Sequence, residues 1–174
     1  MMTILIVLAA AAQAYLLGSI DTGILVSKYL YHDDVRNYGS GAAGMTNMLR
    51  TFGKKAAALT AAGDVLKGVA AVCIGRWLFG FLPENAAVSP YLGVYLTAIL
   101  AVVGHLKPLY FGFKGGKGIL CVGTLALLLD WRVALVAWGL FAALWLLSRY
   151  VSLGSLAAAA SLPFSAFFVF DHNW

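Results

Sequence analysis

The first twenty residues of the chain, MMTILIVLAAAAQAYLLGSI (Met1–Ile20), contain no charged side chain. Similar uncharged stretches run through residues 85–104, 133–148 and 150–170. An α-helix rises about 1.5 Å per residue, so roughly twenty apolar residues cross the hydrocarbon core of a bilayer. These stretches therefore predict transmembrane helices.

The composition indicates the same class of protein. Of the 174 residues, 62% are hydrophobic and 11% are charged, whereas soluble domains carry about 25% charged residues. We predict an all-α, polytopic integral membrane protein that forms a single transmembrane domain over residues 1–174. A cleaved signal peptide is not expected, because the first segment lacks a basic start and stays apolar to about Tyr31.

About six helical spans are expected. They cover approximately residues 3–31, 55–79, 91–106, 118–129, 133–147 and 151–170. The fourth is short, because a helix of this length reaches only about 18 Å, against a hydrocarbon core of roughly 30 Å. Either it begins earlier, near Phe111, or its N-terminus lies inside the membrane, as in proteins that hold anions near the bilayer.

The basic residues predict an orientation. The net charge is +5, and most cations fall in three connections between spans: Lys28, Arg36, Arg50, Lys54, Lys55, Lys107, Lys114, Lys117 and Arg149. By the positive-inside rule these connections face the cytoplasm, and both termini lie outside. A nucleic-acid partner is not expected, because the aromatic residues lie inside apolar segments rather than among the cations.

Two glycine-rich loops interrupt the apolar pattern. The first glycine-rich loop is GSGAAGMTNMLR (Gly39–Arg50), and the second is FKGGKG (Phe113–Gly118). Each is expected to lead directly into an apolar helix. A glycine-rich turn at a helix N-terminus offers free backbone N–H groups and the positive end of the helix dipole, which suit a phosphate group. The two loops together predict a site for phosphorylated substrates at the bilayer surface.

Glycines in this chain allow two interpretations. In the second loop, Gly115, Gly116 and Gly118 are bracketed by lysines, so we favour close approach of the backbone to phosphate. The alternative is close helix packing, which is common in membranes. For the isolated Gly18, Gly23 and Gly123 we favour packing.

Polar residues inside the spans are expected to face the protein interior. Asp64 and Lys67 are neighbours on one helix face, and they form either a structural ion pair or part of a substrate site. Asp21 either pairs with a loop cation or is an interface residue without chemical role. Gln13 is expected to make an interhelical hydrogen bond.

Several other reactive residue types are expected to be structural. Cys73 and Cys121 are interpreted as small buried hydrophobic residues, with neither a disulfide nor a metal site. Arg36, with Asp33 and Asp34, is interpreted as a solvated turn.

The order of the motifs resembles the bacterial acyl-phosphate:glycerol-3-phosphate acyltransferase family over essentially the whole chain. The motifs that carry the resemblance are GSIDTG (18–23), GSG (39–41), TNMLRTFGKKA (46–56), DVLKG (64–68), GH (104–105) with Pro108, FKGGKG (113–118) and YVSLGS (150–155). The family usually has Pro in place of Asp21 and Asn-Pro in place of Ala42-Ala43. It also usually ends in a seventh span with a His and an Asn, whereas this sequence ends after the sixth predicted span.

The resemblance implies a bacterial inner-membrane enzyme of phospholipid biosynthesis with its active site facing the cytoplasm. Such enzymes transfer a fatty acyl group from acyl phosphate to the first hydroxyl of glycerol 3-phosphate, giving lysophosphatidic acid and phosphate. Membrane lipids are the expected surroundings. No cofactor, metal ion or nucleotide is implied.

The residues themselves suit this chemistry. Two unit charges about 4 Å apart interact by roughly 4 kcal/mol at an effective dielectric constant of 20, so bringing two phosphate groups together requires more than one cation. Arg50 provides a bidentate fork for phosphate, and lysines act as mobile point charges. Arg50 and Lys117 are the predicted catalytic residues, which stabilise charge on the carbonyl oxygen and the leaving phosphate.

The predicted substrate-binding residues come from both loops and from the last connection. They are Ser40, Gly41, Thr46, Asn47, His105, Lys114, Gly115, Gly116, Gly118, Ser152 and Ser155. His105 is either a general base or a structural residue. An acyl-serine intermediate at Ser40 is disfavoured, because no base is recognisable beside it.

Other functions remain open at this point. The same loops could form an anion site in a small anion or glycerol-phosphate transporter, a lipid-binding membrane protein or an inactive paralogue. A transporter would show flux without forming lysophosphatidic acid.

Overall fold

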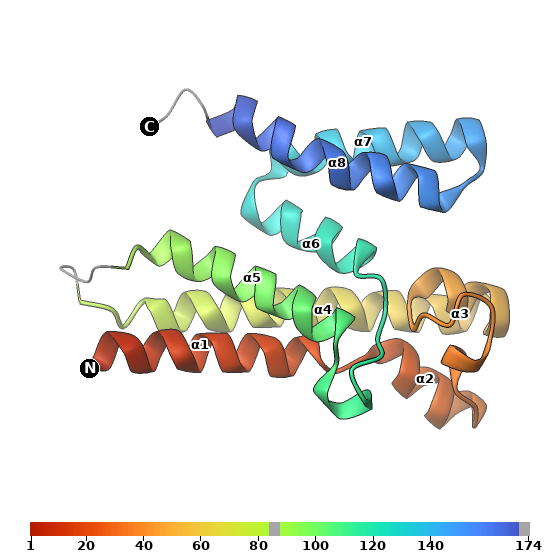
Figure 1. Cartoon of the computed structure of the whole chain (residues 1–174), viewed down its shortest axis with the longest axis horizontal. Coiled ribbons are helices and arrows are strands. Elements are labelled where there is room, and N and C mark those ends of the chain that lie inside the picture. Colours follow the sequence, from red (N-terminus) through yellow and green to blue (C-terminus); the bar gives the residue numbers. More distant parts are fainter. Residues whose placement is uncertain (84–87, 171–174) are drawn as a thin grey trace. The chain divides into compact units, whose positions relative to one another are not determined.

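The computed structural model describes residues 1–83 and 88–170, and all secondary structure in these residues is helical (Figure 1). The helices are α1 (Met2–Gly18), α2 (Thr22–Tyr31), η1 (Val35–Asn37), α3 (Met45–Phe52), α4 (Lys54–Phe79), α5 (Pro90–Leu106), η2 (Leu109–Phe111), α6 (Ile119–Leu129), α7 (Trp131–Ser148) and α8 (Val151–Phe170). This confirms the predicted all-α class.

Five helical segments are long and apolar enough to cross a membrane. They cover residues 2–31, 54–79, 91–111, 131–148 and 151–169. The remaining predicted span corresponds to α6, which has only 11 residues. The expectation of a short fourth helix is therefore confirmed, and α6 begins at Ile119 rather than near Phe111.

The chain divides into two compact units, Met1–Cys121 and Val122–Trp174. The first contains α1 to α5, and the second contains α7 and α8, while α6 begins in the first unit and ends in the second. In the first unit, α1 lies against α4 and α5. The single transmembrane domain expected from the sequence stays a prediction.

The first predicted span, residues 3–31, corresponds to the apolar span over residues 2–31, but it consists of two helices, because the chain breaks between α1 and α2. Asp21 is fully buried and caps α2, with its Oδ1 accepting a hydrogen bond from the backbone N of Ile24 (3.2 Å). A carboxylate that bonds to nearby backbone N–H groups competes with helix continuation. The break frees the carbonyl oxygen of Ile20, which accepts a hydrogen bond from Lys67 Nζ (2.8 Å). The interrupted backbone is thus satisfied inside the protein, as a membrane requires.

Small residues bring the helices of the first unit into close contact. A Cβ atom added at Gly18 would collide with the carbonyl oxygen of Ala101 on α5, and one added at Gly23 would collide with that of Ala43. Only glycine allows backbones to approach this closely. The packing role predicted for Gly18 and Gly23 is confirmed.

Gly123 also has the predicted packing role, in the second unit. A Cβ atom there would lie 2.9 Å from Trp138 Cζ2 on α7. The indole Nε1 of Trp138 donates a hydrogen bond to the Gly123 carbonyl oxygen (3.2 Å).

Two further expectations concern single side chains in the first unit. Gln13 Nε2 on α1 donates to the carbonyl oxygen of Ala71 on α4 (3.0 Å), so the predicted interhelical hydrogen bond is confirmed. Cys121 is buried as expected, but Cys73 is exposed. The prediction that Cys73 is buried is wrong, because its position on α4 falls outside the set of α4 residues that pack in the interior.

The polar connection between α2 and α4 contains a helix that the sequence interpretation missed. Residues 45–52 form α3, which lies beside α4. Its apolar residues, Met45, Met48, Leu49 and Phe52, have the spacing of one helical face. The first glycine-rich loop therefore leads into a short amphipathic helix, and the expectation that it leads directly into an apolar span is wrong.

Candidate active site

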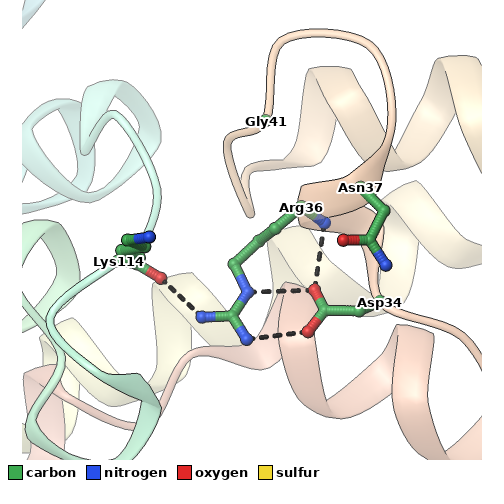
Figure 2. A pocket seen from close by; sticks show the side chains of 5 residues that line it. All are labelled: Asp34, Arg36, Asn37, Gly41 and Lys114. Carbon is green, nitrogen blue, oxygen red and sulfur yellow. Dashed lines mark hydrogen bonds and ion pairs between the residues drawn. The ribbon is translucent and has the colours of Figure 1, made fainter.

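The two connections that carry the glycine-rich loops touch each other within the first unit. The backbone N of Ala43 donates to the carbonyl oxygen of Gly115 (3.4 Å). Arg36 Nη1 donates to the carbonyl oxygens of Phe111 (2.8 Å) and Lys114 (3.2 Å). Figure 2 shows Arg36 reaching toward Lys114 in this way. The convergence of the two loops, on which the predicted site depends, is confirmed.

The first glycine-rich loop is organised around the buried amide of Asn47. Its Nδ2 atom lies within hydrogen-bond distance of the carbonyl oxygens of Val35 (3.1 Å), Tyr38 (3.0 Å) and Ala42 (3.0 Å). Its Oδ1 atom accepts from the backbone N of Ser40 (3.3 Å). The amide of Asn47 therefore fixes the loop conformation, while its predicted contact with substrate phosphate stays a prediction.

A carboxylate and a guanidinium face each other beside this loop. Arg36 donates from Nε to Asp34 Oδ1 (2.9 Å) and from Nη2 to Asp34 Oδ2 (2.7 Å). Such bidentate pairs are stronger than single neutral hydrogen bonds. The hydrogen bond from Arg36 lowers the pKa of Asp34 to about 2. Both side chains are about one-fifth exposed, so the interpretation of a solvated turn is corrected to a partly buried ion pair.

A cavity of about 310 Å³ lies beside these residues (Figure 2). It is lined by Asp34, Arg36, Asn37, Gly41 and Lys114. This volume is at the lower end of the range for small-molecule sites. Gly41 and Lys114 belong to the predicted substrate-binding set, whereas the other three residues were missed.

Three predicted cationic residues of the two glycine-rich loops are exposed: Arg50 on α3, and Lys114 and Lys117 in the second loop. Within residues 1–83 and 88–170, no hydrogen bond or ion pair occupies these three side chains. Their donor groups are therefore free to bind an anion. Ser40 is exposed and Thr46 is half-buried in the first turn of α3.

Contacts within the protein explain why glycine occupies these positions of the second loop. A Cβ atom at Gly116 would collide with His105 Nε2, and one at Gly115 would collide with the His105 carbonyl oxygen. The backbone N of Gly116 donates to that same carbonyl oxygen (3.2 Å). Gly118 has a φ of +76°, a conformation that favours glycine. The phosphate contacts that we favoured for these glycines stay predictions.

A buried polar cluster lies on α4 and α5, next to the second loop. Lys67 Nζ is 2.8 Å from Asp64 Oδ1 and 2.8 Å from His105 Nδ1. Of the two interpretations for Asp64 and Lys67, the structural ion pair describes these contacts. Because an ammonium group can only donate, His105 Nδ1 is the acceptor. His105 is thus a buried residue that contacts the loop. Its part in substrate binding stays a prediction, as does the alternative role as a general base.

The last connection belongs to the second unit. Ser155 is buried on α8, and its hydroxyl donates to the carbonyl oxygen of Val151 (2.8 Å); Ser152 is exposed. Their part in substrate binding stays a prediction. In the described part of the chain, no group of three His, Cys, Asp or Glu residues could hold a metal ion.

The sequence matches a family model described as glycerol-3-phosphate acyltransferase over residues 8–173. A protein of that name from Neisseria meningitidis serogroup C (strain 053442) is 41% identical over 170 residues, covering 95% of this chain and 80% of the relative. Another, from Thermosynechococcus vestitus (strain NIES-2133 / IAM M-273 / BP-1), is 39% identical over 175 residues, covering 100% of this chain and 82% of the relative.

Solved structures show the same similarity. The glycerol 3-phosphate form of PlsY (YgiH), an integral membrane glycerol 3-phosphate acyltransferase, has a TM-score of 0.79 and 35% identity, covering 97% of this chain and 78% of the PlsY chain. Its lysophosphatidic acid form has a TM-score of 0.75 and 33% identity over the same shares of both chains. With its helical membrane architecture, its touching glycine-rich loops and these relatives, the chain belongs to the glycerol-3-phosphate acyltransferase family.

Proposed function

We propose that this chain transfers a fatty acyl group from acyl phosphate to glycerol 3-phosphate, giving lysophosphatidic acid and inorganic phosphate. The observation that supports this most is the contact between the two glycine-rich connections. These connections bear three cationic side chains, Arg50, Lys114 and Lys117, that have no partner among the described residues. The glycerol 3-phosphate and lysophosphatidic acid forms of PlsY are consistent with the acceptor and the product.

In the proposed reaction, the first hydroxyl of glycerol 3-phosphate attacks the carbonyl carbon of acyl phosphate. The new ester bond forms as the bond between that carbon and the phosphate oxygen breaks. The proton of the hydroxyl group is transferred to the released inorganic phosphate. Negative charge develops on the carbonyl oxygen and on the leaving phosphate. Arg50 and Lys117 are proposed to stabilise this charge, because preorganised donors aimed at developing charge lower the barrier most.

The remaining predicted residues have binding roles in this scheme. Ser40, Gly41, Thr46 and Lys114 would hold the phosphate of glycerol 3-phosphate beside the cavity. The backbone of the second glycine-rich loop would hold the acyl phosphate, and Ser152 or Ser155 would add a hydroxyl group. Asn47 would act by keeping Ser40 in place.

The proposed location is the bacterial cytoplasmic membrane, with the site facing the cytoplasm and both termini outside. In the first unit, eight lysine and arginine residues lie in or beside the two glycine-rich connections, namely Lys28, Arg36, Arg50, Lys54, Lys55, Lys107, Lys114 and Lys117. Such a concentration favours the cytoplasmic side. Each buried CH₂ of an acyl chain contributes about 0.8 kcal/mol, so donor and product stay in the lipid while glycerol 3-phosphate arrives from water.

Purified protein in liposomes tests this proposal. Acyl phosphate and glycerol 3-phosphate together should release inorganic phosphate and form lysophosphatidic acid in equal amounts, whereas either substrate alone should give neither product. Acyl-CoA should not replace acyl phosphate. Flux of glycerol 3-phosphate into the liposomes without lysophosphatidic acid would overturn the proposal in favour of a transporter.

A further inference from the structure

We infer that Arg36 is a positioning residue for the acyl transfer, which holds the second glycine-rich loop in the conformation that presents Lys114 and Lys117. The inference rests on the proposed function. The group formed by Arg36, Asp34 and the carbonyl oxygens of Phe111 and Lys114 is called the interloop link below.

The donors of Arg36 are already occupied by the protein. Nε and Nη2 bind the two oxygens of Asp34 at 2.9 and 2.7 Å. Nη1 donates to the carbonyl oxygens of Phe111 and Lys114 at 2.8 and 3.2 Å. A guanidinium has five N–H groups, so little donor capacity is left for a substrate phosphate. Arg36 therefore acts through the loop and not by direct contact with substrate.

The loop has a conformation that needs support. Phe113 lies between the two carbonyl groups that Arg36 holds, and its φ is +59°. Such a conformation is uncommon for a bulky side chain, and it persists only where the surroundings hold it. Lys114 follows directly, so the direction of its side chain depends on this backbone. The interloop link therefore holds the backbone on both sides of Phe113, the residue with the strained conformation.

Few other polar contacts join the two connections. In residues 1–83 and 88–170, the other hydrogen bond between them runs from Ala43 N to the Gly115 carbonyl oxygen and is longer, at 3.4 Å. Between the two connections the remaining contact is apolar, since Phe111 packs against the core that contains Val35 and Met48. Apolar packing is non-directional and does not fix the carbonyl orientation of Lys114.

Arginine is required at this position because of its shape. The planar guanidinium binds a carboxylate with one edge and still offers Nη1 to two carbonyl groups, whereas lysine has one compact ammonium group. Arg36→Lys should therefore retain the charge but lose the link. This separates positioning from simple attraction of anionic substrates, which lysine would preserve.

The test measures kcat, KM and loop protection in the full chain. Arg36→Gln, Arg36→Lys and Asp34→Asn are compared with the parent protein and with Lys55→Gln, which alters an exposed cation on α4. Since small misplacements of reacting groups cost up to about 100-fold in rate, both Arg36 variants should lose roughly 10- to 100-fold in kcat with a smaller change in KM. Lys55→Gln should match the parent, and added guanidinium should partly restore Arg36→Gln.

Hydrogen exchange provides the second measurement. Amides of residues 112–118 should exchange faster in both Arg36 variants, while those of α1, α4 and α5 keep their protection. Parental kcat and loop protection in Arg36→Lys would overturn the inference, as would equal loss of protection in the loop and the helices of both variants. If the parent forms no lysophosphatidic acid, the proposed function fails, and the exchange measurement still decides whether Arg36 orders the loop.

Discussion

The first unit contains two groups of cationic side chains with opposite surroundings. Lys67 is buried and has three polar partners: Asp64, His105 and the carbonyl oxygen of Ile20. Arg50 and Lys117 are exposed, and in the part of the chain that the structure describes no hydrogen bond or ion pair occupies their side chains. A cation buried in a membrane protein needs hydrogen-bond partners from the protein. An exposed cation can keep its donor groups for a ligand.

This difference separates a cation that stabilises the fold from cations that are proposed to act on substrate. Lys67 donates to the Ile20 carbonyl oxygen at the break between α1 and α2 and also contacts His105. The carbonyl oxygen of His105 in turn accepts a hydrogen bond from the backbone N of Gly116. The buried cluster therefore holds the second glycine-rich loop through His105 and does not need to contact substrate. Arg50 and Lys117 have no such partners among the described residues, so their loss should affect catalysis more than folding.

The largest expected effect on stability comes from removing the buried cation. Lys67→Met leaves the carboxylate of Asp64 without its ion-pair partner and the Ile20 carbonyl oxygen without a donor. Breaking a buried pair costs about 3–5 kcal/mol, so the free energy of unfolding in detergent should fall by that amount. The control is Lys28→Met, whose exposed contact with Asp34 (3.7 Å) is worth at most about 1 kcal/mol. Equal stability of the two variants would remove the distinction between the two groups.

The exposed group should show the reverse pattern. Arg50→Ala should lower kcat/KM for glycerol 3-phosphate by about 100- to 1,000-fold, the loss typical for a donor to developing charge, with little change in unfolding. Lys54→Ala, an exposed cation two residues beyond α3, is the matched control and should keep nearly full activity. A parental rate for Arg50→Ala at limiting glycerol 3-phosphate would contradict the catalytic assignment.

Gly116 lies between the buried cluster, which it contacts through His105, and the exposed Lys117. Its substitution should have an intermediate effect. In Gly116→Ala the new Cβ would collide with His105 Nε2, so the loop must shift away from the buried cluster. A displacement of this kind should lower turnover by about 10- to 100-fold, measured as phosphate release. Gly139→Ala, where a Cβ atom would meet no atom of the described residues within 4 Å, should be active. Full activity of Gly116→Ala would show that the loop position does not depend on His105.

The smallest expected effect concerns acid titration at the interloop link. The hydrogen bond from Arg36 lowers the pKa of Asp34 to about 2. A lowered pKa in the folded state means that the pair stabilises the fold above the ordinary value of 3.8 and loses this contribution as the pH falls toward 2. Carboxyl carbon NMR of labelled protein should give a midpoint near 2, and Arg36→Gln should move it toward 3.8. An unchanged midpoint in the variant would refute the pairing.

Periodic features of the chain could be predicted well. Long apolar segments identified the spans, because a bilayer imposes a minimum length and excludes charge. Isolated glycines such as Gly18 and polar residues such as Gln13 were assigned correctly, because inside a membrane they have few alternatives to helix–helix contact. The short amphipathic helix α3 was missed although its apolar spacing was visible, since the glycine-rich loop before it dominated the interpretation.

Contacts between distant residues could not be predicted in the same way. Arg36 lies 75 residues from Phe111, and its sequence neighbours Asp33 and Asp34 suggested only a solvated turn. Likewise, nothing next to Asp21 in sequence indicated that Lys67 would satisfy the adjacent Ile20 carbonyl oxygen. Both assignments depended on which side chains the folded helices bring together.

By itself, the sequence determined that the chain is helical, that it belongs in a membrane, and that two glycine-rich loops carry the cations suited to phosphate. These properties follow from hydrophobicity, helix length and local charge, which are additive along the chain. Only the tertiary structure decided which cations are occupied. Whether an arginine binds a ligand or a carbonyl group depends on distances of about 3 Å, and those are set by packing between segments far apart in sequence.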